Sequence, residues 1–91
     1  MVTKQELDQA LEAWDVARET ALREHEAWHL LSRSHGALID SLRANGHAWV
    51  SAQAEFQRIS TAHSEAYRAA LDAMDTRCVD YQELRAKYDR Q

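Results

Sequence analysis

The stretch Ala44-Asn45-Gly46-His47 lies almost at the midpoint of this 91-residue chain, and it decides the fold. Proline is absent and Gly36 is the only other glycine, so helix-ending residues stand together only here. Glycine, and less often asparagine, adopts the left-handed backbone conformation that ends a helix. Because so short a connection turns the chain back on itself, we expect two long antiparallel helices. One helix continuing through this point is the competing structure, which the Asn-Gly pair disfavours.

The first predicted helix begins at a capping signal close to the N-terminus. In Thr3-Lys4-Gln5-Glu6 the threonine hydroxyl can accept a hydrogen bond from the Glu6 amide, and the Glu6 side chain can reach back. We therefore predict one all-α helical-hairpin domain over residues 1–91, with a helix at about 3–44, a turn at 45–46 and a helix at about 47–89.

Each predicted helix has one weak point. A kink is expected near Gly36, because glycine inside a helix costs ~1 kcal/mol relative to alanine. A second is expected near Val79, because Asp80-Tyr81-Gln82-Glu83 also has the form of a capping box.

Apolar residues recur at steps of three, four or seven in both halves of the chain, which is typical of helices that pack on helices. In a hairpin that turns at residues 45–46, His35 lies opposite Phe56, and Trp28 lies opposite His63. The residues expected in the core or at a dimer interface are Leu11, Trp14, Trp28, Ile39, Leu42, Trp49, Phe56, Ile59, Met74, Tyr81 and Leu84.

A second set of apolar residues lies beside this seam, and two helices alone would leave it exposed. Its members are Leu22, Leu31, Leu38, Tyr67, Leu71 and Val79. Exposed apolar surface of that extent marks an interface. We therefore predict a homodimer in which two hairpins form a coiled-coil-like four-helix bundle.

Charge and composition exclude several classes of function. The eleven Lys and Arg residues are scattered and the net charge is −4, so direct nucleic-acid binding is not expected. No apolar stretch approaches the ~20 residues of a membrane span, and the N-terminus lacks the apolar core of a signal peptide. Cys78 is the only cysteine, which excludes an internal disulfide and fits a cytoplasmic location. No cofactor is expected.

An enzyme is not expected either. Two glycines cannot build a glycine-rich phosphate loop. His63 lies about four helical turns from Cys78 on the same helix, too far for a nucleophile and its base. A helical hairpin also has no preformed cleft for a substrate.

Three histidines give one alternative function. His25 and His29 are four residues apart, a spacing that can place two imidazoles on one metal ion. The hairpin pairing puts His63 opposite Trp28, at a height between them. A metal-binding helical bundle is therefore one hypothesis, and histidines that are solvated or bonded to the backbone are the simpler one.

Acidic residues give another alternative function. They recur at helical spacing along one side of the first helix, and they are Asp8, Glu12, Asp15, Glu19 and Glu26. Steps of ~5–6 Å along a helix are close to the phosphate spacing of a nucleic-acid strand. Such a row can bind a groove of Lys and Arg, although a solvated helix face has the same pattern.

The sequence as a whole predicts a non-enzymatic protein–protein interaction module, a small adaptor or inhibitor that binds a partner protein of unknown identity. Its expected binding surface is formed by the flanking apolar residues and the acidic residues of the first helix. One alternative is an inhibitor of the phage or mobile-element type, which blocks a basic surface of a host defence or nucleic-acid-binding complex with the acidic residues. The histidine-based metal-binding bundle is the other.

Overall fold

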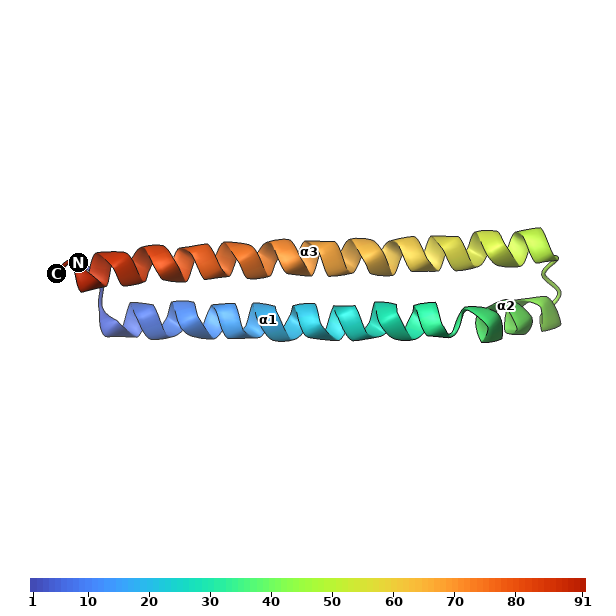
Figure 1. Ribbon diagram of the computed structural model, residues 1–91, viewed down its shortest axis with the longest axis horizontal. Helices are drawn as coiled ribbons and strands as arrows, with labels where there is room; N and C mark the ends of the chain where they lie inside the picture. Colours follow the sequence, from blue (N-terminus) through green and yellow to red (C-terminus); the bar gives the residue numbers. More distant parts are fainter.

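The structure, a computed structural model, describes all 91 residues, and it is a rod of three helices without strands. Helix α1 spans Lys4–Arg33, α2 spans His35–Ala44 and α3 spans Trp49–Asp89. Helices α1 and α2 follow each other along one side, and α3 runs back beside them to the end where both termini lie (Figure 1). The rod measures 66 × 15 × 14 Å. The predicted all-α antiparallel hairpin is confirmed.

The reversal is built around Gly46, the only residue with a positive φ, at 96°. Its amide donates to the Arg43 carbonyl at 3.1 Å, and the His47 amide donates to the Leu42 carbonyl at 3.1 Å. This pair of hydrogen bonds is the Schellman motif, which satisfies the last carbonyls of a helix. Helix α3 begins at Trp49, two residues later than predicted, because the two preceding residues complete the reversal.

The first half of the chain is broken at Ser34, two residues before the glycine at which a kink was predicted. The Ser34 hydroxyl donates to the Leu30 carbonyl at 2.8 Å, and the Ser34 amide bonds the carbonyls of Leu30 and Leu31. The next backbone bond across the junction runs from the Leu38 amide to the Ser34 carbonyl at 2.9 Å. The amides of residues 35–37 between them make no backbone bond, as in the first turn of a new helix.

Replacing Gly36 with alanine is expected to stabilise the rod by about 0.5–1 kcal/mol, because alanine loses less backbone entropy in a helix. Nothing lies within 4 Å of the added Cβ, and φ at Gly36 is negative. Thermal unfolding followed by circular dichroism measures the change. Gly46→Ala is the control and should destabilise by about 1 kcal/mol, because its φ is positive. A lower midpoint for Gly36→Ala would contradict the expectation.

The two ends of the chain are held by side-chain hydrogen bonds. The Thr3 hydroxyl accepts from the Glu6 amide at 3.2 Å, which confirms the predicted N-cap. The Gln91 side chain accepts from the Val2 amide at 2.7 Å and donates to the Val2 carbonyl at 2.9 Å. The first and last turns of the rod are therefore tied side by side.

Helix α3 continues without a break past Val79, so the second predicted interruption is wrong. The Asp80 side chain, which would have capped a new helix, instead pairs with Arg77 at 3.2 Å, one turn earlier on the same helix. A pair at this spacing stabilises a continuous helix.

Only five residues are buried in this thin rod: Leu7, Ala21, Ile39, Ala52 and Ala70. Three of them are alanines. Of the residues predicted for the core, Ile39 is buried and Leu11 and Trp49 are 38% and 51% exposed. The others lie half-buried along the contact between the helices: Trp14, Trp28, Leu42, Phe56, Ile59, Met74, Tyr81 and Leu84. The guanidinium of Arg43 lies over the ring of the exposed Trp49, with its central carbon 5.6 Å from the centre of that ring.

The pairing of the two halves follows the turn closely. The His35 ring lies edge-on to Phe56 at 4.4 Å, as predicted. The Trp28 ring lies 5.8 Å from Tyr67, which is one helical turn beyond the predicted neighbour His63 on α3. The His25 ring also lies 5.2 Å from Tyr67, within one residue of the predicted pairing, so α1 and α2 keep nearly the same register against α3.

Candidate functional site

Two grooves between α1 and α3 lie in the half of the rod nearer to the termini. The outer groove, of about 320 Å³, is lined by Lys4, Leu7, Asp8, Leu11, Tyr81, Arg85 and Tyr88. The inner groove, of about 260 Å³, is lined by Arg18, Ala21, Leu22, His25, Tyr67, Leu71 and Met74. Every inner position is 14 residues from an outer one on the same helix, so the grooves repeat two heptads apart, ~21 Å along one face.

The same face is mostly apolar between the grooves. Trp14 and Cys78 occupy the intervening heptad together with Asp15, which pairs with Arg18, and the Trp14 ring stacks on Tyr81 at 5.9 Å. We call this surface the apolar face, and its members are Leu7, Leu11, Trp14, Ala21, Leu22, Tyr67, Leu71, Met74, Cys78, Tyr81 and Tyr88. Leu22 is its most exposed aliphatic side chain, at 59%. Water therefore contacts apolar carbon on one side of this half of the rod.

The apolar face ends near Tyr67. One heptad nearer the turn, its positions on α3 are Ser60 and Ser64, which line a groove of about 300 Å³ with polar and charged neighbours and Trp28. The opposite side of the rod carries a groove of about 550 Å³ lined mostly by polar and charged residues: Glu6, Gln9, Arg77, Asp80, Glu83 and Lys87, with Ala10, Ala13 and Leu84. The apolar grooves are thus restricted to one face of one half, although single apolar side chains such as Leu30 and Val50 are exposed elsewhere.

The acidic residues predicted to bind a partner divide into two groups. Glu12, Glu19 and Glu26 are exposed, make no ion pair and stand seven residues apart, ~10.5 Å from one to the next along α1. We call these three residues the acidic row. Asp8 and Asp15 instead pair with cations of their own helix, Lys4 at 3.7 Å and Arg18 at 3.0 Å. Of the five predicted acidic residues, the three in the acidic row are therefore the ones that carry an unpaired negative charge.

The predicted three-histidine site is not assembled. The rings of His25 and His29 lie parallel, 6.1 Å apart, and His25 also lies 5.2 Å from Tyr67. No group of three or more His, Cys, Asp or Glu side chains could hold a metal ion. Tyr67 is the α3 ring that lies near both His25 and Trp28, where His63 was expected.

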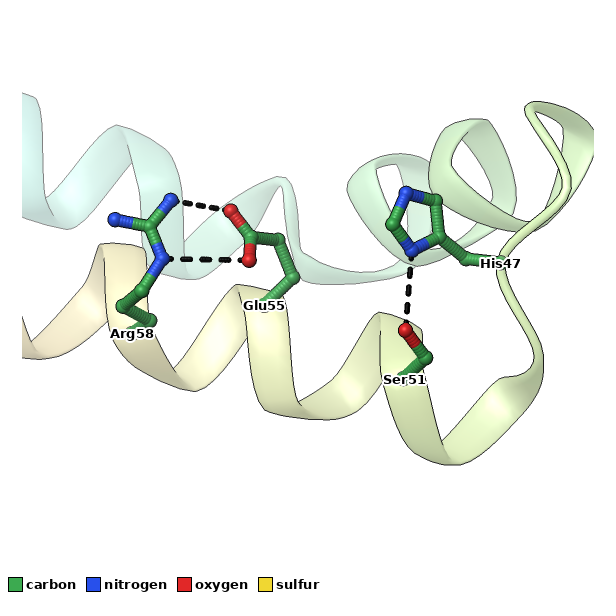
Figure 2. A network of polar contacts seen from close by, with 4 residues as sticks. All are labelled: His47, Ser51, Glu55 and Arg58. Carbon is green, nitrogen blue, oxygen red and sulfur yellow. Dashed lines mark hydrogen bonds and ion pairs between the residues drawn. The ribbon is translucent and has the colours of Figure 1, made fainter.

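One polar cluster was not predicted, and it lies at the start of α3. Figure 2 shows His47 beside Ser51, with ring Nδ1 and Oγ 3.1 Å apart, and Glu55 held by two hydrogen bonds from Arg58. Spacings of three and four residues were the sequence signal for both contacts. The bonds from Arg58 lower the pKa of the Glu55 carboxyl below its ordinary value.

This pKa shift predicts a pH dependence of stability. Because the folded pKa of Glu55 is lowered, the contribution of the pair is present above the ordinary carboxylate pKa and is lost as pH falls through the lowered value. Wild type should therefore unfold at a higher temperature than Glu55→Gln at pH 7, and the gap should close once the pH falls below the lowered pKa of Glu55. Glu65→Gln, exposed and unpaired, is the control and should show no such gap. A gap that persists at low pH would contradict the assignment.

Comparisons with protein-family models, with curated proteins and with solved structures found no match for this chain. None of the three helices contains an apolar stretch long enough to cross a membrane. The two surfaces that distinguish the rod are its apolar face and its acidic row.

Proposed function

We propose that the chain is a non-enzymatic protein–protein interaction module, a small adaptor or inhibitor that acts by binding other protein chains through its apolar face. The observation that carries this proposal is the repeat of two apolar grooves, two heptads apart, on one face. A helix with apolar residues at heptad spacing presents side chains that fit such a repeat. We expect it to act in the cytoplasm, where the lone thiol of Cys78 stays reduced.

Leu22 and Leu30 provide a matched test. Both are leucines of α1, exposed to 59% and 58%, but only Leu22 belongs to the apolar face. The tagged full-length chain is used to capture proteins, including untagged copies of itself, from host cells. Wild type and Leu30→Glu should retain the same proteins, and Leu22→Glu should lose them, with helix content compared by circular dichroism. Equal capture by all three would overturn the proposal.

The acidic row supports a second candidate, an inhibitor that blocks a basic surface of a defence or nucleic-acid-binding complex, as mobile elements encode. Its three unpaired carboxylates project from α1 at a regular spacing, so they present negative charge to a groove of Lys and Arg.

Charge-matched variants separate the second candidate from a general effect of net charge. The triple change of Glu12, Glu19 and Glu26 to Gln should abolish salt-sensitive capture. A control triple, Asp72→Asn, Asp75→Asn and Glu83→Gln, removes as many charges from exposed positions of α3 and should leave capture unchanged. An equal loss of capture with both triple variants would contradict a specific role of the acidic row.

A further inference from the structure

We propose that the apolar face is covered by a second copy of this chain, packed antiparallel to the first about a two-fold axis that passes beside Cys78. This inference rests on the proposed function and names the partner of that face. Four features of the rod carry it: its exposed area, the place where the apolar face ends, the symmetry of the face and its neutralised charges.

The exposed area is large for the mass. A compact protein of 10.5 kDa exposes about 5,400 Å², whereas this chain exposes 6588 Å². The excess of roughly 1,200 Å² is larger than the ~800 Å² that each partner contributes to a standard interface. One copy therefore offers enough surface for a stable dimer.

The extent of the apolar face decides the relative direction of the two copies. In a parallel dimer the polar half near the turn, with Gln57, Ser60 and Ser64, would be pressed against the same half of the other copy. Buried polar groups without partners are costly. In an antiparallel dimer centred on the apolar face, only the apolar halves overlap, and the two turns extend into water in opposite directions.

The symmetry of the face fixes the axis. On α3 its two ends are Tyr67 and Tyr88, and Met74 and Tyr81 are its inner pair, so the centre of both pairs lies between Arg77 and Cys78. A two-fold axis there lays the inner groove of each copy over the outer groove of the other. It also brings each Cys78 beside its counterpart and Leu71 beside Arg85 of the second copy, each within about one residue of the directly opposite position.

Charge does not oppose this packing, although the chain carries a net charge of −4. The cations that line the two grooves are each paired with an acid of their own helix: Lys4 with Asp8, Arg18 with Asp15, and Arg85 with Asp89. The acidic row lies outside the face, on positions that line neither groove. Two apolar faces can therefore meet without unpaired like charges.

The mass of the purified full-length chain tests whether the second copy binds. Sedimentation equilibrium should give twice the chain mass for wild type and for Leu30→Glu. It should give a dissociation constant weakened about 100-fold or more for Leu22→Glu, which would bury an unpaired carboxylate. Unchanged helix content shows that Leu22→Glu still folds. A wild-type monomer, or a dimer that Leu22→Glu leaves intact, would overturn the inference.

Disulfide formation under mild oxidation tests the arrangement. Wild type should form a covalent dimer through Cys78, and Cys78→Ser should not. In the Cys78→Ser background, Leu71→Cys mixed with Arg85→Cys should cross-link, whereas Leu71→Cys alone should not. The opposite pattern would overturn the antiparallel arrangement. A pure monomer that still captures another protein through Leu22 would overturn this inference alone, and a dimer that captures no other protein would restrict the module to self-association.

Discussion

Replacing Ile39 with alanine should lower the free energy of unfolding by about 2–4 kcal/mol, the largest loss expected from truncating one side chain of this rod. Ile39 is 2% exposed and is the only large side chain that is fully buried. The substitution removes three buried carbons, and two helices held at a fixed distance cannot close the space completely. Because only five residues are buried, few other contacts can replace the lost one.

Urea unfolding measures this effect, with Leu30→Ala as the control. Leu30 loses as many carbons but is 58% exposed, so its change should stay within about 0.5 kcal/mol. Equal losses from both variants would mean that α2 is not held against α3 through Ile39. The urea dependence should stay constant if only the stability of the folded rod changes.

Replacing Ala52 with leucine should destabilise the rod by about 1–3 kcal/mol, although leucine is nearly as good a helix former as alanine. Ala52 is completely buried, at 0% exposure, on the first turns of α3 near the reversal. A larger side chain there has to push α2 away from α3, close to the hydrogen bonds that Gly46 makes.

Ala54→Leu is the matched control for Ala52→Leu, because Ala54 is exposed two residues later on the same helix. Its stability should change little. If thermal unfolding gave the same midpoint for both leucine variants, the close approach of α2 and α3 at Ala52 would be disproved.

Local signals in the sequence predicted the ends and the reversal of the rod. Thr3 and Gly46 act through hydrogen bonds to residues three to five positions away, so their roles are visible in a short stretch of sequence. The break at Ser34 was predicted only approximately. Glycine weakens a helix, but the serine hydroxyl that bonds Leu30 decides which residue ends it.

The candidate site was less accessible from the sequence, because it depends on register. Heptad spacing identified Leu22, Tyr67 and Leu71 as flanking residues, but not that they line one groove. The α3 ring nearest to Trp28 is that of Tyr67, one helical turn beyond the expected His63. Pairing between helices is set by how side chains pack across them, which hydrophobic periodicity does not specify.

The hydrogen bonds between Val2 and Gln91 hold the two ends of the chain at the same tip of the rod. A mechanical load applied to both ends would therefore unzip the helices pair by pair instead of shearing them past each other. The half that carries Leu22 and Tyr67 would have to open before the half that carries the turn. A second chain bound to that half would consequently set the force at which unzipping begins.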